Sequence, residues 1–302
     1  MDFKIRWWIL FCLPLIIISN TVFAQWRGKF EQLGHELPTP NRYRTASGAP
    51  GPSYWQQRAD YVIDVEVDDQ TQILSGKETV TYHNNSPQPL AYLWLQLEQN
   101  KMKKSSGANL SQTNEVRDSL PAKFFASNTG NFDYDGGFNI LSVVDQEGRP
   151  LSYWINDTMM RIDLPVTLKA KETFTFTIAW NYHEYDRLKF SERGGYEYFP
   201  EDGNYVYSFA QWYPRLCVYD DVEGWQNKQF LGDGEFALTF GDFRVKITVP
   251  ADHIVGATGW IRNLKEVLTR EQLTRFEKAQ KSFDQPVFIV TEEEARKKEK
   301  HS

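Results

Sequence analysis

The sequence predicts a mainly β protein: a large antiparallel domain of the sandwich type, with a short helical segment at the C-terminal end. Three observations support this fold class. Large apolar residues alternate with small or polar ones over residues 173–182, which places five apolar side chains on one face of a strand, whereas a helix would spread them around its axis. Helical periodicity begins only at Thr269. A hydrophobic content of 41% with 15% aromatic residues is too rich for a disordered chain.

The first 24 residues have the features of a secretory signal peptide. Lys4 and Arg6 precede a short apolar stretch, and Ala24 is the small residue that a signal peptidase requires. We therefore expect cleavage after Ala24 and a periplasmic or secreted protein that begins at Gln25. A retained membrane anchor is the alternative, which the shortness of the apolar stretch disfavours. Past residue 24 no apolar run reaches the ~18 residues that a membrane helix needs, so we expect no stable membrane insertion after cleavage.

Residues 25–53 predict a leader without regular structure. The segment is polar, and prolines and glycines interrupt it at a density that resists helix and strand. We expect this leader to lie on the surface of the β domain, which spans residues 54–290.

The strands of that domain follow from period-2 alternation and from apolar runs. Residues 61–67 and 76–82 predict a first hairpin that turns around Asp69. Residues 90–97 are apolar on both faces apart from Gln96, as in a strand that is covered on both sides. Residues 243–249 repeat the alternation up to Pro250. Shorter candidate strands span residues 140–144, 151–155, 160–164, 235–240 and 254–258.

Residues 101–137 form a long polar interruption that contains Lys101, Lys103 and Lys104. A loop of this length is unusual in a compact domain, so it is either mobile or functional. A solvated excursion is the favoured interpretation.

Helix signals appear only after this β-rich region. Thr269 with Gln272 forms a capping-box pattern before an amphipathic segment. Thr291 with Glu294 begins a second, highly charged helix over residues 291–302. This charged tail has almost no apolar face, so we expect it to fray alone and to be the start of a longer segment.

Composition excludes some functions. The net charge is −6 and no basic block is present, so the chain is a poor candidate for nucleic-acid binding. Removing Cys12 with the signal peptide leaves Cys217 alone, which rules out an internal disulfide. Core burial must then hold the fold, and a domain of this length can supply it. The lone thiol is more typical of a small buried residue than of a nucleophile.

Motifs for catalysis are missing. His183-Glu184 begins like the zinc motif H-E-x-x-H, but Arg187 stands where the second histidine is needed. Neither a G-x-S-x-G elbow nor a phosphate-binding G-x-x-x-x-G-K-[ST] loop is present. We therefore expect no catalytic residue, no metal and no cofactor in this chain.

Two clusters are open to a functional interpretation. Asp220, Asp221 and Glu223 could hold a hard cation, although a solvated turn is favoured. Residues 196–225 contain ten aromatic side chains, which either belong to the core or stack on sugars or a peptide. The alternation of aromatic residues over residues 205–209 favours the core for part of this set.

Three stretches together carry a family resemblance. They are N-R-Y-R-T-A-S-G-A-P-G-P (41–52) with Y-W-Q-Q-R-A-D-Y (54–61), Q-W-Y-P-R (211–215) with Y-D-D (219–221), and F-G-D-F (240–243) through V-P (249–250) to G-A-T-G (256–259). With them, residues 41 to 290 resemble the N-terminal region of a bacterial zinc aminopeptidase of the aminopeptidase N family, the gluzincin metallopeptidases.

The resemblance implies a protein of two domains with different roles. Family members begin with a large saddle-shaped β domain, which is followed by a helical catalytic domain that carries H-E-x-x-H and a distal glutamate. Only the first part is present in this sequence, so zinc is expected in the missing catalytic domain, and that domain is an expected partner. Without zinc and its activated water the chain should not cleave peptides.

The resemblance also implies one substrate contact. In the family's β domain, a Gln or acidic residue just before the aromatic–Pro signature holds the free amino group of the peptide, and Gln211 is the nearest match here. An amide oxygen can accept a hydrogen bond from an ammonium group. The alternative is that Gln211 satisfies backbone groups at a strand end.

These observations favour the N-terminal β domain of an exported zinc aminopeptidase-like protein, which would wall the substrate cleft and hold the amino end of the peptide. The first alternative is a stand-alone β-sandwich module that binds glycans or peptides. Three or more of Tyr196, Tyr198, Trp212 and Trp225 on one exposed flat face would favour that module. The second alternative is a degenerate protein kept for protein–protein contact.

Overall fold

The computed structural model describes residues 40–111, 119, 134–190, 192–201, 203–232, 234 and 236–297. The predicted signal peptide, most of the leader, most of the predicted loop after residue 111 and the last five residues of the charged tail lie outside this description. The chain divides into two compact units, Met1–Tyr54 and Trp55–Ser302. The assignment of these segments as signal peptide, leader, β domain and tail stays a prediction.

The described part of the first unit consists of turns and one isolated antiparallel bridge, between Arg44 and Pro50. The side-chain oxygen of Asn41 accepts hydrogen bonds from the backbone N–H groups of Tyr43 and Arg44, at 2.7 and 2.9 Å. The Arg44 guanidinium lies over the ring of Tyr54, 5.1 Å from its centroid. An Asx turn and a cation–π contact therefore order this segment without helix or strand.

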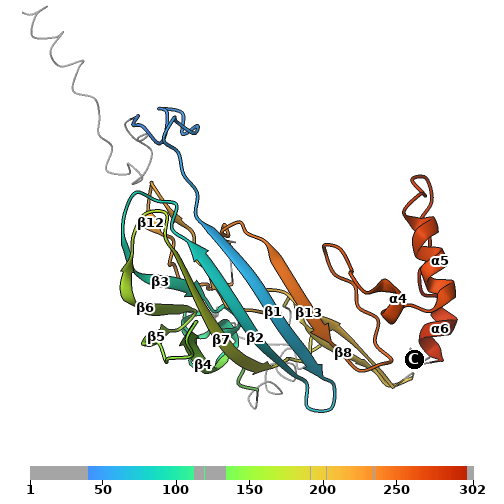
Figure 1. Ribbon diagram of the computed structural model, residues 1–302. Helices are drawn as coiled ribbons and strands as arrows, with labels where there is room; N and C mark the ends of the chain where they lie inside the picture. Colours follow the sequence, from blue (N-terminus) through green and yellow to red (C-terminus); the bar gives the residue numbers. More distant parts are fainter. Residues whose placement is uncertain are drawn as a thin grey trace, which may run out of the picture. The chain divides into compact units, whose positions relative to one another are not determined.

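The second unit is mainly β, which confirms the predicted fold class (Figure 1). Its largest sheet has five strands, and each pair is antiparallel except β13 with β1, which is parallel. In sheet order the strands are β13 (Phe243–Thr248), β1 (Arg58–Asp68), β2 (Ile73–His83), β7 (Thr173–His183) and β4 (Asn139–Asp145).

A second, four-stranded sheet is also antiparallel. Its order is β10 (Arg215–Leu216), β3 (Leu90–Gln96), β6 (Met159–Leu168) and β5 (Tyr153–Asn156). Two small hairpins complete the strands: β8 (Gly195–Phe199) with β9 (Asn204–Ser208), and β11 (Tyr219–Asp220) with β12 (Gly224–Trp225).

One hydrophobic core joins the two larger sheets. Alternate residues of β1, β2 and β7 supply one side and alternate residues of β3 and β6 supply the other, and many of them are fully buried. Gly76 lies opposite Trp180 in this core, and a Cβ at that position would come within 2.3 Å of the indole ring. Glycine is therefore required there for close packing, although it costs about 0.5–1 kcal/mol in a strand.

Helices are short and lie mainly near the end of the chain. The predicted capping box at Thr269 is confirmed, since its side chain accepts from Gln272 N–H and caps α5 (Arg270–Ala279). A second capping box starts α6 (Glu292–Arg296), and Arg275 pairs with Glu294 to join the two helices. The other helices among the described residues are η1 (Glu98–Met102), α2 (Gly107–Leu110) and α4 (Leu264–Val267). Within the described residues, no helix is long and apolar enough to cross a membrane.

Some sequence predictions differ from the structure. Residues 254–258 are not a strand, and the side chains of Ile254 and Val255 are exposed, because no neighbouring strand pairs with this segment. In the predicted strand 235–240, residue 235 lies outside the described residues and Leu238 forms only an isolated bridge with Cys217. The second face of strand β3 is covered only in part, since Gln96 is buried there but Tyr92 and Trp94 are half-buried.

Candidate functional site: a small pocket at Gln211

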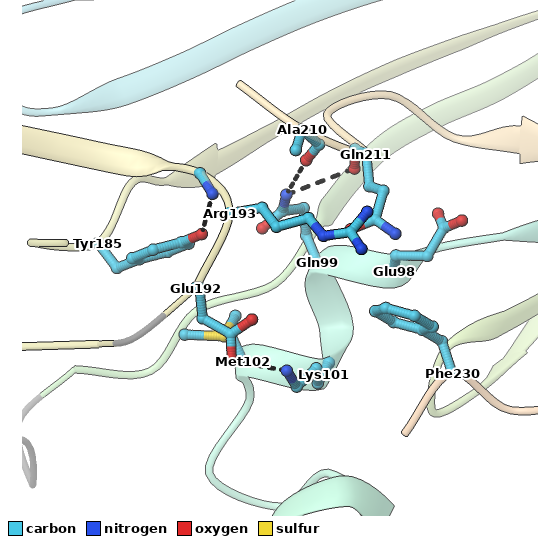
Figure 2. A pocket seen from close by; sticks show the side chains of 11 residues that line it. Glu98, Gln99, Lys101, Met102, Tyr185, Glu192, Arg193, Ala210, Gln211 and Phe230 are labelled. Carbon is cyan, nitrogen blue, oxygen red and sulfur yellow. Dashed lines mark hydrogen bonds and ion pairs between the residues drawn. The ribbon is translucent and has the colours of Figure 1, made fainter. Parts of the chain in front are cut away.

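The pocket lies where η1, the segment between β7 and β8, and the turn before β10 come together, and Phe230 completes its lining (Figure 2). Its volume is about 20 Å³, which is room for about one water molecule. It can therefore receive a small polar group, such as an amino group, rather than a whole ligand.

The turn before β10 brings Gln211 to the pocket. Gln211 has a φ of +54°, in the left-handed region that costs an L residue roughly 1–2 kcal/mol. The side-chain amide of Gln99, in η1, donates hydrogen bonds to the backbone carbonyls of Ala210 at 2.9 Å and Gln211 at 3.4 Å. These bonds stabilise the turn, and Figure 2 shows the Gln211 side chain extending from it into the pocket.

A buried ion pair secures the other end of the same segment. The guanidinium of Arg215, the first residue of β10, donates to a carboxylate oxygen of Glu98 in η1. Glu98 is only 2% exposed, and its second carboxylate oxygen has no hydrogen-bond partner among the described residues. Consecutive residues of η1 thus hold both ends of the segment that carries Gln211.

The remaining walls carry balanced charges. Lys101 and Glu192 form an ion pair of 2.6 Å across the pocket, and Arg193 lines it next to Glu192. The Tyr185 hydroxyl accepts a hydrogen bond from Gly194 N–H at 2.8 Å, and burial raises the pKa of this phenol. The walls carry two carboxylates and two cations, so the pocket has no strong negative field. It can still bind an ammonium group through hydrogen-bond acceptors.

Of the residues named in the sequence analysis, two line this pocket: Gln211, the predicted substrate contact, and Lys101, from the start of the predicted polar loop. The side-chain amide of Gln211 makes no hydrogen bond to another residue that the structure describes, so the alternative role of satisfying backbone groups finds no support there. Sequence reasoning missed Glu98 and Gln99. The available signal was that these polar residues directly follow an apolar strand, where buried polar side chains often hold a neighbouring loop.

The aromatic segment does not form a shared exposed face. Trp212 packs near Trp180, with ring centroids 6.3 Å apart, and Trp225 packs near Tyr82 at 6.2 Å, so both rings lie against the core. Tyr198 is exposed on β8, and Tyr196 is half-buried on the same strand. The specific arrangement that would favour a glycan site on these four rings is therefore absent.

The predicted acidic cluster is a turn. The Asp220 carboxylate accepts hydrogen bonds from the backbone N–H groups of Val222 and Glu223, at 3.0 and 2.8 Å. Across the described residues, no group of three or more His, Cys, Asp or Glu side chains could hold a metal ion. The described residues therefore do not fit the zinc site of a metallopeptidase.

Cys217 is fully buried next to Leu216 in the core. Burial raises the pKa of its thiol to about 12, and the nearby Arg215 charge offsets this only in part. A thiol in this environment is not a nucleophile at neutral pH.

Comparisons with known proteins give weak structural matches. No protein-family model matches the sequence, and no curated protein matches it. Among solved structures, the first neighbours are zinc metallopeptidases. An M1 zinc metallopeptidase from Deinococcus radiodurans has 14% identity and a TM-score of 0.32, over 69% of this chain and 37% of that enzyme. A two-domain M1 mutant with L-tryptophan bound has 14% identity and a TM-score of 0.33, over 71% and 39%.

A further match is a GH20 exo-β-N-acetylglucosaminidase from Vibrio harveyi, with 12% identity and a TM-score of 0.23, over 54% of this chain and 17% of that one. The chain spans 37 to 39% of the length of the two metallopeptidases. At these TM-scores, neither the substrates nor the metals of these enzymes carry over to this chain.

Proposed function

We propose that this chain is the N-terminal β domain of an exported zinc aminopeptidase-like protein. In this role it shapes one wall of the substrate cleft, and Gln211 holds the amino end of a peptide. The catalytic zinc belongs to a separate catalytic domain, and we expect no peptide hydrolysis by this chain, because the residues that the structure describes offer no group that could hold the metal.

One observation carries this proposal. Gln211, the residue that the family resemblance assigns to the amino group, lines the pocket. Its amide oxygen makes no hydrogen bond to another described residue, so it can accept one from an ammonium group. The second oxygen of Glu98 is a further acceptor in the same pocket wall.

Arg193 opposes the binding of an ammonium group in this pocket. Its guanidinium lines the same pocket and repels an approaching ammonium group. A bound amino end must therefore displace Arg193 or place the guanidinium against another carboxylate. The domain alone is expected to bind weakly, and replacing Arg193 with a neutral residue should strengthen the interaction.

The exposed face of β13 supports the proposed partner domain. Phe243, Val245 and Ile247 pair in register with Tyr61, Ile63 and Val65, so they lie on the core face of the sheet. The three β13 side chains are nevertheless 38 to 49% exposed. An apolar stripe on the inner face of a parallel strand pair is normally covered, and a catalytic domain would provide that cover.

The test is an NMR titration of the full chain with L-leucinamide, a small mimic of a peptide amino end. We expect shift changes centred on Gln211 and Gln99 with L-leucinamide and none with N-acetyl-L-leucinamide, whose amine is blocked. Gln211→Ala should abolish the response and Arg193→Gln should strengthen it. Equal responses to both ligands would overturn the role of Gln211.

An aminoacyl-anilide assay of the same protein with added zinc tests the non-catalytic part of the proposal. We expect no turnover. Chelator-sensitive hydrolysis that copurifies with the chain through successive columns would show that it carries its own metal site.

A further inference from the structure

The outer face of the four-stranded sheet carries an aromatic and charged cluster that the proposed function does not use. Trp94 on β3, Arg161 on β6 and Trp154 on β5 are paired in register, so they form one row across three strands. Tyr92 and Asp163 form the next row on β3 and β6. We call these five side chains the outer platform.

The side chains of the outer platform are ordered against one another. The rings of Trp94 and Trp154 lie 5.2 Å apart at an angle of 81°, which makes a nearly right-angled corner. The Arg161 guanidinium lies over the ring of Tyr92 at 4.1 Å. Its Nε also donates to an Asp163 carboxylate oxygen at 2.8 Å. Arg161 is thus fixed by a cation–π contact and an ion pair.

This cluster is not part of the core. The other face of the same strands buries Leu93, Leu95 and Ile162 completely. Trp154 is 43% exposed, whereas Trp94 and Tyr92 are half-buried by their neighbours in the platform. Trp and Tyr side chains that combine an apolar ring with a polar group are enriched where proteins bind ligands.

We propose that the outer platform is a binding site for a neutral carbohydrate chain. The apolar C–H face of a pyranose ring packs on an indole ring, and a right-angled corner receives one such ring against two walls. The hydroxyl groups of the sugar need donors and acceptors at the edge of the ring. The Arg161 guanidinium and the Asp163 carboxylate supply them.

Two further features favour a neutral sugar. Asp163 compensates the charge of Arg161, so the platform has no net charge with which to attract a phosphate backbone or an acidic polymer. The indole N–H groups of Trp94 and Trp154 make no hydrogen bond to another residue that the structure describes. They are therefore available to a sugar. An indole N–H donates hydrogen bonds and does not accept them, and the oxygen of a sugar hydroxyl can accept such a bond.

The test is a titration of the full chain, followed by isothermal titration calorimetry or by NMR. The ligands are cellohexaose and maltohexaose, two neutral glucose hexamers of different linkage. We expect one or both to bind with a dissociation constant between micromolar and millimolar. Trp154→Ala should weaken binding at least about tenfold, a loss of about 1.4 kcal/mol. Trp154→Tyr should retain most of it, because it keeps an aromatic face.

Trp260→Ala is the matched control, because Trp260 is 82% exposed but lies outside the outer platform. It should leave the affinity unchanged, and circular dichroism should show that all variants keep the fold. Failure of both hexamers to bind, or equal loss in the Trp154 and Trp260 variants, would overturn the proposal. Binding of a deca-proline peptide with no binding of either hexamer would also overturn it and would assign the platform to peptides. None of these outcomes depends on Gln211.

Discussion

The side-chain amide of Gln99 donates a hydrogen bond to the backbone carbonyl of Ala210 at 2.9 Å, and it lies 3.4 Å from the next carbonyl, that of Gln211. Two carbonyl oxygens that point toward one donor are a marked local feature, because backbone carbonyls of a turn usually face water. Gln99 is 8% exposed, so a replacement without a donor would leave both carbonyls poorly solvated.

We therefore predict that Gln99→Leu destabilises the protein by about 1–3 kcal/mol and weakens L-leucinamide binding.

Gln211→Gly, in contrast, should stabilise the protein. Glycine adopts a positive φ without strain, so this variant should gain up to about 1 kcal/mol while losing the ligand response. Urea unfolding and the NMR titration together measure both effects. A Gln211→Gly variant that loses stability would contradict the inferred strain.

The Glu98–Arg215 ion pair makes a second prediction. Both side chains are largely buried, at 1% and 14% exposure. Removing one partner of such a pair leaves a buried charge and costs roughly 3–5 kcal/mol. We expect this loss for Arg215→Met in urea unfolding.

The double variant Glu98→Gln/Arg215→Met is the control. It should recover much of the stability, because no unpaired charge remains. A double variant as unstable as the sum of the two single variants would show that the pair is not coupled.

How far the sequence predicts this fold depends on the distance over which each signal acts. The hairpin of β1 and β2 and strand β7 were predictable, because their alternation is local and their inner faces are buried. The capping boxes at Thr269 and Thr291 were predictable for the same reason. The parallel pairing of β1 with β13 was not, because it joins residues far apart in the chain.

The same limit applies to the sites. Gln211 was found from a local motif, but its support comes from Gln99, which is distant in sequence and carries no motif. The outer platform depends on the register of three strands, so Trp94 and Trp154 meet only after folding. The apolar run over residues 90–97 predicted full cover on both faces, whereas Tyr92 and Trp94 are only half-buried, because an aromatic side chain suits a core and a binding face equally well.

Glu184 predicts a pH dependence of stability. Burial raises the pKa of its carboxyl from 4.5 to about 7, although the nearby polar groups of Tyr182 and Tyr185 oppose the shift. The folded state therefore keeps the proton between pH 4.5 and about 7, while the unfolded state loses it. The contribution of Glu184 to the free energy of unfolding therefore falls with rising pH across this window, by about 3 kcal/mol in total, and is constant above it.

Urea unfolding of the wild type and of Glu184→Gln as a function of pH checks this prediction. The neutral amide has no proton to lose, so the difference in stability between the two proteins should grow across the window in favour of the variant. A difference that is independent of pH would mean that Glu184 is ionised in the folded state.

Cys217 should be unreactive in the native protein. Its side chain is fully buried and the pKa of its thiol is raised to about 12, so little thiolate is present and reagents cannot reach it. In a Cys12→Ser background, Ellman's reagent should label Cys217 only after denaturation in urea. Rapid labelling of the folded protein would show that the β10 region opens readily.

The apolar stripe on β13 predicts self-association of the chain when no partner domain covers it. Val245 and Ile247 are 39% and 38% exposed on the core face of the sheet, at the open edge next to β1. Exposed edge strands with apolar faces associate readily. Val245→Thr/Ile247→Lys should therefore reduce association in sedimentation and light-scattering measurements without lowering the unfolding temperature.

Val222→Lys is the control, because Val222 is 57% exposed and lies outside β13. It should have no effect on association. A wild-type chain that stays monomeric and unfolds cooperatively at high concentration would show that β13 needs no cover, and the main support for a partner domain would be lost.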